Sequence, residues 1–359
     1  MVTEHASSRL VLVDNAWVDG CWAGPSVLRW ESDELRFVGP RREFDAESSG
    51  SISGHLRGTV LPGFTDSHVH LGLIDPDALV AGGLARVVDL GGVPSESRRW
   101  QQLGLDSGEK PRVQVEFAGA FLTAPGGYPS TRSWARAESI REIATTADGA
   151  AAVTEMVASG ASLIKIALNA EAGPTWADEV VSAVVDRAHA AGLPVVAHTE
   201  GDGQARRAVL AGVDRLAHTP FSERLSDADI VLHAGRCAWV STLDIHGWGD
   251  HTDQFEIAQG NLRRFAAAGG QVLYGTDLGN GPLPTGLNPR EVGALFGAGL
   301  SLDAVVSALV PPAYPARGFG PLLSWIPTAA TDSPHPIDQA AWLSTATVVP
   351  VTALEEILQ

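Results

Sequence analysis

The chain has 359 residues, of which 45% are hydrophobic and 19% charged, and this composition is typical of a globular protein with an ample core. Length alone favours about two domains, although an α/β barrel of roughly 250 residues can form a single unit. There are 25 basic against 42 acidic side chains, which gives a formal charge of −17. We expect no nucleic acid partner, because phosphate backbones are bound by clustered Lys and Arg and this chain has no basic run.

The cysteine content and the amino terminus bear on the compartment. Cys21 and Cys237 are too few for a disulfide framework and do not form a CxxC spacing, so we expect a reducing environment. The amino-terminal sequence MVTEHASSRLVLVDNAW has neither the basic nor the apolar segment of a leader. No stretch approaches the roughly 18 apolar residues of a membrane helix. These observations predict a cytoplasmic protein without a membrane partner.

The hydrophobic pattern changes near residue 60. Residues 9–59 form short alternating runs broken by Gly and Asp, which predicts the β-hairpins of a small sheet. After them come apolar runs, each followed by a polar loop and an Ala-rich helical stretch. The eight runs cover residues 59–70, 85–92, 112–121, 161–168, 193–199, 215–219, 238–246 and 271–278. Helices are predicted over residues 147–161, 176–193, 202–213, 253–270, 290–299 and 301–310.

Eight apolar strands that alternate with helices predict a parallel sheet closed into a (β/α)8 TIM barrel. An open doubly wound sheet is the alternative, but it would require a Gly-rich phosphate loop after the first strand, and LPGFTDSHVHL has none. We place the barrel at residues 60–334. A small β-sandwich-like domain is expected from residues 1–59 together with residues 335–359, where the run 346–351 returns a strand to the amino-terminal sheet.

The first barrel strand ends in His68-Val69-His70. Side chains alternate faces along a strand, so both imidazoles point the same way and can reach one metal ion. By itself this pattern is weak, because two polar side chains at a strand end need no metal. The other polar residues of the predicted strands strengthen it. Four of them lie at or near the same ends of strands four, five, six and eight: Lys165, His198, His218 and Asp277.

The carboxyl ends of barrel strands form one rim, where catalytic residues gather. Six nitrogen and oxygen donors therefore converge there and predict a site for divalent metal. Zn²⁺ is favoured, and Mn²⁺, Fe²⁺ and Co²⁺ are alternatives.

Lys165 is the most informative of these residues. The chain has two lysines, and Lys165 lies between Ile164 and Ile166 in a strand expected to be buried on both faces. Desolvation lowers the pKa of such an amine and makes it a nucleophile. It could form a Schiff base, or take up carbon dioxide to give a carbamate that bridges two metal ions. The Schiff base leaves the four histidines unused, whereas the carbamate uses them all. A lysine that extends to the rim for solvation is the remaining alternative.

Six stretches of the barrel resemble the amidohydrolase superfamily, in its binuclear branch with a carboxylated lysine, close to prolidase-like and imidazolonepropionase-related hydrolases. They are LPGFTDSHVHLG, LARVVDLGG, AFLTAPGGYP, LIKIAL, AHTEGDGQARRAVLAGVDRLAHT and YGTDLG. The resemblance implies two metal ions. His68, His70 and Asp277 would bind the more buried ion, His198 and His218 would bind the second, and carboxylated Lys165 would bridge both. Asp277 would also act as the catalytic acid and base.

Two loops supply candidate substrate contacts. Residues 120–134 form a long Gly-rich loop with Tyr128, where relatives often carry His, and Arg132. After the seventh strand, LDIHGWGDH places His246, Trp248 and His251 near the rim. Ordinary loop packing is an equally good interpretation of these side chains. Asp89, in VVDLGG, is expected to hold its loop in place.

The expected activity is hydrolysis of an amide bond in a small molecule or short peptide, such as a dipeptide, an N-acyl amino acid or a secondary-metabolite amide. A mononuclear deaminase or imidazolonepropionase-like enzyme, or a hydrolase of lactones or cyclic imides, is the alternative among enzymes. A catalytically silent binding or scaffold protein is the alternative outside them. The sequence leaves a homo-oligomer open, and its carboxyl-terminal segment departs most from the family pattern.

Overall fold

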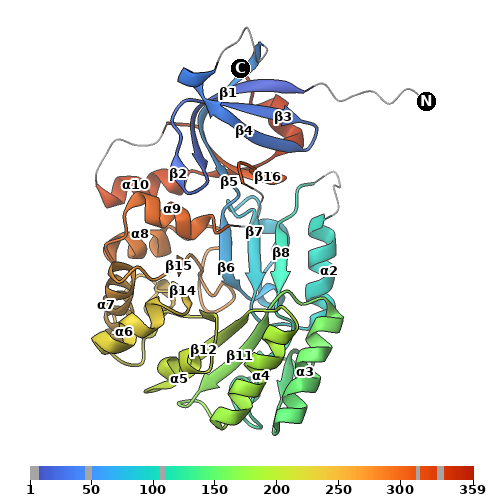
Figure 1. Ribbon diagram of the computed structural model, residues 1–359, viewed down its shortest axis with the longest axis vertical. Helices are drawn as coiled ribbons and strands as arrows, with labels where there is room; N and C mark the ends of the chain where they lie inside the picture. The colour runs from blue at the N-terminus through green and yellow to red at the C-terminus, as the bar shows by residue number, and fades with distance from the viewer. Residues whose placement is uncertain (1–7, 45–50, 106–109, 313–315, 330–334) are drawn as a thin grey trace, which may run out of the picture.

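The computed structural model describes residues 8–44, 51–105, 110–312, 316–329 and 335–359 (Figure 1). A small sheet lies at one end of the molecule and parallel strands surrounded by helices form the rest. Residues 1–7 lie outside the described residues. They belong to the amino-terminal segment that was predicted to lack a leader. None of the described helices combines the length and apolar character needed to cross a membrane.

The small sheet combines both ends of the chain in the strand order β17-β16-β5-β1-β3-β4, with β2 paired to β1. Its strands are β1 (Arg9–Val18), β2 (Cys21–Trp22), β3 (Ser26–Glu31), β4 (Glu34–Pro40), β5 (Ile52–Pro62), β16 (Leu322–Ile326) and β17 (Thr347–Pro350). The hairpin β1–β2 turns at Asp19-Gly20, where both residues have positive φ, as a two-residue turn requires. The hairpins predicted in residues 9–59 and the returning carboxyl-terminal strand are confirmed.

Strand pairing extends the small sheet beyond the predicted segments. β5 runs on to Pro62, and β16 joins the sheet from a segment that the sequence analysis placed in the barrel. Trp325 and Val60 are partners in this pairing. The small sheet therefore also includes residues 322–326. The predicted domains, residues 1–59 plus 335–359 and residues 60–334, stay a prediction.

Ten parallel strands carry the site. They are β6 (Thr65–Val69), β7 (Arg86–Asp89), β8 (Gln114–Phe117), β9 (Phe121–Thr123), β10 (Ile140–Glu142), β11 (Ile164–Asn169), β12 (Val195–Glu200), β13 (Arg215–Leu216), β14 (Ala238–Val240) and β15 (Val272–Leu273). A strand lies in each of the eight predicted runs. The strands form a three-stranded sheet, β6-β7-β8, and a seven-stranded one, β10-β9-β11-β12-β13-β14-β15. The mixed α/β class is confirmed, and closure into one barrel stays a prediction.

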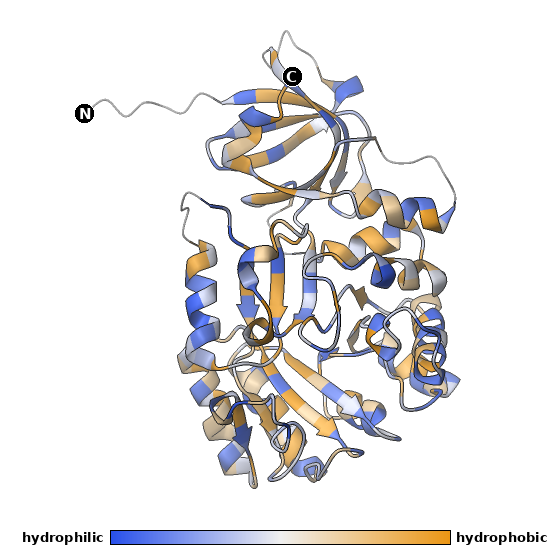
Figure 2. Cartoon of the chain, turned by 180° about the vertical axis from the view of Figure 1, so that it is seen from behind, coloured by the Kyte–Doolittle hydropathy of each residue, from blue (hydrophilic) through white to orange (hydrophobic). Residues whose placement is uncertain are grey.

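Nine α-helices of the described residues flank these strands, and Figure 2 shows hydrophobic residues concentrated on the strands while the helices carry both kinds of residue. They are α2 (Pro94–Leu105), α3 (Thr146–Ser159), α4 (Asp178–Ala190), α5 (Gln204–Leu210), α6 (Asp227–Ala234), α7 (Asp253–Ala267), α8 (Pro289–Gly297), α9 (Leu302–Leu309) and α10 (Pro336–Leu343). The six predicted helices are confirmed. The sequence analysis missed α2, α6 and α10, which are polar, short or Pro-rich.

Candidate metal site

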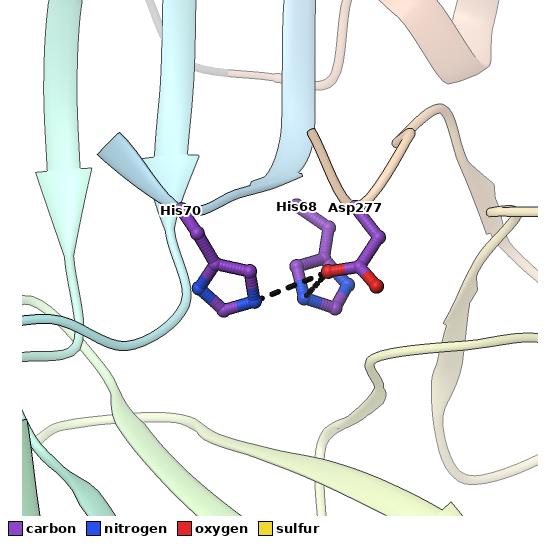
Figure 3. Close-up of side chains that lie close together, drawn as sticks. All are labelled: His68, His70 and Asp277. Carbon is purple, nitrogen blue, oxygen red and sulfur yellow. Dashed lines mark ion pairs between the residues drawn. The ribbon is translucent and has the colours of Figure 1, made fainter. Parts of the chain in front are cut away.

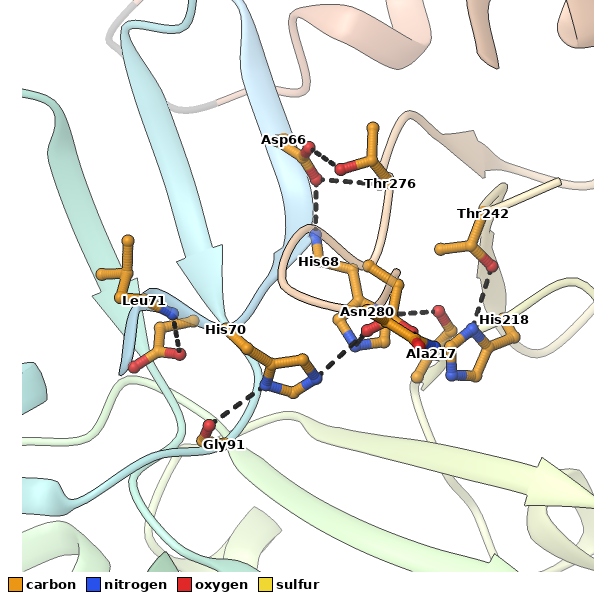
Figure 4. Close-up of polar contacts among 12 residues, drawn as sticks. Asp66, His68, His70, Leu71, Gly91, Ala217, His218, Thr242, Thr276 and Asn280 are labelled. Atoms are coloured by element: carbon orange, nitrogen blue, oxygen red, sulfur yellow. Dashed lines mark hydrogen bonds and ion pairs between the residues drawn. The ribbon is translucent and has the colours of Figure 1, made fainter. Parts of the chain in front are cut away.

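The site begins where β6 ends, and a buried carboxylate ties this end to the segment after β15. Asp66 accepts hydrogen bonds from the backbone N–H of His68 (3.0 Å), the backbone N–H of Thr276 (3.1 Å) and the Thr276 hydroxyl (2.6 Å) (Figure 4). Burial outweighs these bonds and raises the pKa of Asp66 to about 7. Asp66 thus fixes His68 and the residue before Asp277 relative to each other, a role that the sequence analysis did not predict.

Three of the predicted ligands form one compact group. Oδ1 of Asp277 lies 3.0 Å from Nε2 of His68 and 3.1 Å from Nε2 of His70 (Figure 3). The side chains are 1%, 9% and 6% exposed for His68, His70 and Asp277. One ligand atom from each residue lies within 4.8 Å of the others, which is the spacing expected around a single ion.

Hydrogen bonds on the far side of the two imidazoles decide their tautomers. Nδ1 of His68 donates to the carbonyl of Ala217 (2.8 Å), and Nδ1 of His70 donates to the carbonyl of Gly91 (3.1 Å). Carbonyl oxygens only accept, so each neutral ring keeps its proton on Nδ1 and turns the Nε2 lone pair toward Asp277. Two lone pairs and a carboxylate oxygen then face one another without a donor, which is the arrangement that a cation satisfies.

The electrostatics of the group agree with this arrangement. Burial lowers the pKa of His68 to about 4, so its imidazole is neutral at pH 7. Burial also disfavours the charged form of Asp277, but positive charge and hydrogen-bond donation at the positions of the adjacent imidazoles outweigh it and hold the pKa of Asp277 well below its ordinary value; when the imidazoles are neutral, a bound cation would supply that positive charge. Asn280 donates to the other carboxylate oxygen of Asp277 at 2.9 Å. The chemistry of the donors therefore fits a divalent metal ion.

The second pair of predicted ligands lies beside the first group. The His218 ring centroid is 4.8 Å from that of His68 and 4.9 Å from that of His198. Nδ1 of His218 is 3.0 Å from the hydroxyl of Thr242, a buried β-branched residue whose φ of 41° is rare for its type. In the described residues, these two histidines do not form a ligand group of three or more like that around Asp277.

Glu200, which the sequence analysis missed, orients His198. Its carboxylate lies 3.3 Å from Nε2 of His198 and accepts a 2.6 Å hydrogen bond from the Asn169 amide. Asn169 is itself fixed, because its oxygen accepts from the backbone N–H groups of Glu171 and Ala172. The Asn169 amide nitrogen also lies 3.3 Å from this Nε2, but it already donates to Glu200. An ionised carboxylate only accepts, so we assign the His198 proton to Nε2, which leaves the lone pair on Nδ1. The pattern HxE at a strand end was the signal for this residue.

Lys165 lies on β11 with 1% of its surface exposed. Its Nζ has no hydrogen-bond partner among the described residues. Burial lowers the pKa of Lys165 to about 7, although Asp277 and Asp89 act in the opposite direction. A charge on this amine would lower the pKa of His68, His198 and His218, so Lys165 lies close enough to act on both groups of predicted ligands.

Asp89 supports the segment that follows His70. It accepts hydrogen bonds from the Ser97 hydroxyl (2.7 Å) and the Leu71 backbone N–H (3.3 Å). These contacts agree with the structural role expected for this residue.

The loop after β9 brings Tyr128 and Arg132 to the second pair of histidines. The ring of Tyr128 stacks on His198 at a centroid distance of 4.9 Å, and the Arg132 guanidinium lies 5.6 Å from the Tyr128 centroid. Trp134 was not predicted as a contact, yet its ring centroid is 6.2 Å from Tyr128 and 6.4 Å from His70. Its position at the end of the same Gly-rich loop was the available signal.

The three residues predicted from the loop after β14 differ in their exposure. His246 is buried, its ring packs on Phe221 at 4.3 Å, and its Nε2 lacks a hydrogen-bond partner in the described part of the chain. Burial lowers the pKa of His246 to about 4, while Asp277 and Glu200 act in the opposite direction, so its imidazole interacts with the site. Trp248 is 45% exposed. His251, expected near the rim, instead bonds Glu256 at the surface.

Known proteins show only distant similarity to this chain in sequence. No family model matches the chain. Uncharacterized proteins of Mycobacterium bovis and Mycobacterium tuberculosis are 28% identical over 286 residues, which cover 70% of this chain and 72% of theirs.

Solved structures are similar over almost the whole chain. A Xaa-Pro dipeptidase with bound methionine has a TM-score of 0.76 at 17% identity and covers 97% of this chain and 99% of its own. Ochratoxinase of A. niger has a TM-score of 0.75 at 16% identity, with 96% and 95% covered. A putative prolidase from Bifidobacterium longum has a TM-score of 0.72 at 20% identity, with 97% and 94% covered. The chain thus has the fold of these hydrolases, as the resemblance to amidohydrolases predicts.

Proposed function

We propose that this protein is a metal-dependent hydrolase of the amidohydrolase superfamily that cleaves an amide bond in a small molecule or short peptide. The observation that carries the proposal is the buried group of His68, His70 and Asp277, whose three acceptor atoms face one another without a donor. The fold supports it, because solved structures of a dipeptidase, a prolidase and ochratoxinase share it. We propose an amide as the substrate because the predicted ligand motifs resemble those of amidohydrolases.

The two parallel sheets are proposed to form a closed (β/α)8 barrel. Backbone hydrogen bonds between them support this closure. The N–H of Ser67 on β6 donates to Tyr274 after β15 at 2.9 Å, and the N–H of Ser162 before β11 donates to Phe117 on β8 at 3.0 Å. The proposal places His68, His198, His218 and Asp277 on one rim.

Two divalent ions, with Zn²⁺ favoured, are the proposed cofactors. His68, His70 and Asp277 would hold one, and Nδ1 of His198 with His218 would hold the other. Lys165 supports a shared site, because its buried amine has no hydrogen-bond partner among the described residues and lies close enough to act on both groups. Its neutral amine would attack carbon dioxide, forming an N–C bond and releasing one proton, to give a carbamate with two oxygen ligands. Metal ions bound there supply a water of lowered pKa and polarise the scissile carbonyl.

Asp277 is the proposed catalytic residue. Its carboxylate stays ionised at neutral pH and can accept the proton that water loses as it adds to the carbonyl carbon. The same carboxylate then returns this proton to the nitrogen as the C–N bond breaks, so the products are a carboxylate and an amine. Asn280, bonded to the second oxygen, holds the carboxylate in position for both transfers.

Substrate contacts are proposed for Tyr128, Arg132, His246 and Trp248. Burial raises the pKa of Tyr128 well above its ordinary value, so its hydroxyl remains a donor for a substrate oxygen. His246 offers a neutral imidazole with a buried, unpartnered Nε2, which can bind a polar substrate atom. Arg132 is exposed beside Tyr128 and suits a substrate carboxylate.

One observation favours a mononuclear enzyme as a second candidate. Among the described residues, only the group around Asp277 brings three ligand atoms within 4.8 Å. In that case Lys165 would remain an amine, and Lys165→Ala would retain activity with one ion per chain. The binuclear proposal expects this variant to lose one ion and its activity.

The proposal is tested by a screen of dipeptides, N-acyl amino acids and lactones with protein purified in zinc or manganese and bicarbonate. Release of a free amine from an amide is the expected result. Asp277→Asn should lower kcat at least about 100-fold while the fold is kept. Asp202→Asn is the matched control, because Asp202 is an exposed carboxylate in the turn after β12. Activity that persists in Asp277→Asn would contradict the proposed mechanism.

A further inference from the structure

Large hydrophobic side chains at the surface have an uneven distribution. Eight of them are exposed among the described residues. Five lie singly on five different helices, where isolated exposed hydrophobic residues are ordinary: Leu105, Val157, Leu210, Val231 and Ile337. The other three, Leu73, Trp134 and Trp248, lie outside the α-helices.

These three residues, here called the apolar patch, each lie beside His70 or beside the segment that follows Asp277. Trp134 lies with its ring 6.4 Å from His70. Leu73 lies beside Gly279, two residues after Asp277, since a Cβ on Gly279 would be 3.1 Å from Leu73 and 3.2 Å from His70. Trp248 covers Gly281 in the same segment, where an added Cβ would lie 2.5 Å from the indole.

The second pair of histidines has aromatic neighbours, such as Tyr128 stacked on His198, but it also has charged and polar groups that the apolar patch lacks. Glu200 is held by Asn169 and His198, and His246 interacts electrostatically with Glu200. The apolar patch therefore adjoins His70 and the segment after Asp277, whereas a carboxylate, an amide and an imidazole adjoin His198. A substrate that spans the two regions needs an apolar end and a polar end.

We infer that the substrate carries a bulky apolar group, and that this group binds against Leu73, Trp134 and Trp248 while the scissile amide lies at the metal site. The inference rests on the proposed hydrolase function for its chemistry. It adds Leu73 and Trp134 to the specificity residues and narrows the substrates to amides of large apolar acids or amines, such as those with a benzyl side chain.

A substrate group fits this patch better than a second protein chain. Stable protein interfaces use about 20–30 residues on each side, and the patch has three. A permanent partner on the patch would also cover the segments that carry His70 and Asp277, whose side chains are 9% and 6% exposed. Substrate must reach these side chains.

The test compares the binding of two metal-chelating probes, phenylalanine hydroxamate and glycine hydroxamate, to the metal-loaded protein by calorimetry. They differ by one benzyl group. We expect the phenylalanine compound to bind about tenfold or more tightly, as burial of a phenyl group implies. Leu73→Ala and Trp248→Ala should each reduce this ratio about threefold or more and leave glycine hydroxamate within about twofold. Val231→Ala, at an exposed valine on α6, is the control and should change neither affinity.

Each outcome decides between the proposals. Equal binding of the two hydroxamates, or binding of neither, would overturn the inference, as would a Leu73 or Trp248 variant that changes only the oligomeric state in light scattering. Preference for the benzyl compound in a protein that cleaves no amide would keep the inference and overturn the proposed hydrolysis. Amide cleavage without that preference would do the opposite.

Discussion

Each of the four site histidines has one ring nitrogen held by a neighbour. His68 and His70 use backbone carbonyls, His198 uses Glu200, and His218 lies against the Thr242 hydroxyl. Partners of this kind fix ring orientation and raise ligand basicity in metal sites. They also explain how four imidazoles can lie together beside Lys165, because each remaining nitrogen is free to bind a cation in place of a proton.

The first prediction concerns Glu200. Glu200→Ala removes the acceptor that holds Nε2 of His198, so we expect affinity for the second ion to fall about 10–100-fold while the ion at His68, His70 and Asp277 is retained. Titration of the apoprotein with cobalt, followed by visible absorption, measures both sites. Glu171→Ala is the control, because only the backbone of Glu171 contacts Asn169. Loss of both ions, or of neither, would contradict the role given to Glu200.

At this scale the sequence predicted the six candidate ligands but not their supports. These candidates stood out because they follow or interrupt apolar strand runs, where a scarce residue such as Lys165 is conspicuous. Glu200 and Trp134 had only weak signals, the HxE pattern and a place at the end of the Gly-rich loop. Asn169 had none, since its contact with Glu200 depends on side-chain directions across two neighbouring strands. His251 shows the same limit, because two or three residues of turn geometry decide whether a loop histidine faces the site or Glu256.

Local capping explains where several helices begin, and α3 is the clearest example. The Thr145 hydroxyl accepts from the Asp148 N–H while the Asp148 carboxylate accepts from the Thr145 N–H, and Gly160 ends the helix with a φ of 87°. The strands are short, and helices pack on them to complete the apolar core. Phe265 of α7, for example, stacks on Trp239 of β14 at a centroid distance of 3.9 Å. Element stability therefore depends on both caps and packing.

The second prediction tests the cap of α3. Thr145→Ala removes one half of the capping box and should lower the free energy of unfolding by about 1 kcal/mol. Urea denaturation of the intact chain provides the measurement. Thr146→Ala, at the exposed first residue of α3, is the control and should change stability by less than about 0.5 kcal/mol. Equal effects of the two changes would argue against the cap.

The third prediction concerns the loop after β14, which a buried carboxylate anchors. Glu291 on α8 accepts from the backbone N–H groups of Leu243 (3.0 Å) and Asp244 (2.7 Å). Burial outweighs these bonds and raises the pKa of Glu291 to about 7, above its ordinary value of 4.5. The folded state therefore holds this proton more tightly, and the resulting stabilisation is full below pH 4.5 and is lost as the pH rises through 7.

Glu291→Gln cannot titrate, so the difference in unfolding free energy between wild type and variant should shrink as the pH rises from 4.5 to 7.5. The change should be about 2–3 kcal/mol. Urea denaturation at several pH values checks it, and all groups shared by the two proteins cancel in the difference. Parallel pH profiles for the two proteins would refute the role of Glu291.

The small sheet connects the amino-terminal and carboxyl-terminal segments of the chain. β5 pairs with amino-terminal β1 on one side and with carboxyl-terminal β16 on the other, so the sheet closes only after both ends of the chain are made. Ser324 on β16 accepts the N–H of Phe64, just before β6, and links this sheet to the start of the site-bearing strands (2.9 Å). The last segment, η6 (Val351–Glu356), adds Val351 and Leu354 to the core of the small sheet.

The fourth prediction follows from that core. Leu354 is 1% exposed, so Leu354→Ala should cost about 2–4 kcal/mol of stability. Leu358, half-buried at the edge of the same core, is the comparison, and Leu358→Ala should cost less than half as much. Thermal unfolding of both variants measures the difference. A silent Leu354→Ala would show that the carboxyl-terminal segment does not stabilise the sheet.

The sequence predicted the class of fold at this scale because long apolar runs alternate with amphipathic helices, a pattern that survives local irregularity. It did not predict that residues 322–326 pair with the small sheet, since a single strand far along the chain carries no signal for the sheet it joins. The helix α2 was missed because its sequence is polar overall, and α10 because it begins in a Pro-rich stretch.

The central claim is that the buried donors of this chain hold two metal ions that share Lys165. The most direct measurement is the number of ions retained per chain, by elemental mass spectrometry, after purification with zinc and bicarbonate and extensive dialysis. The account predicts two ions per chain in the wild type and fewer in Lys165→Ala. Wild-type protein that retains one ion or none would contradict it.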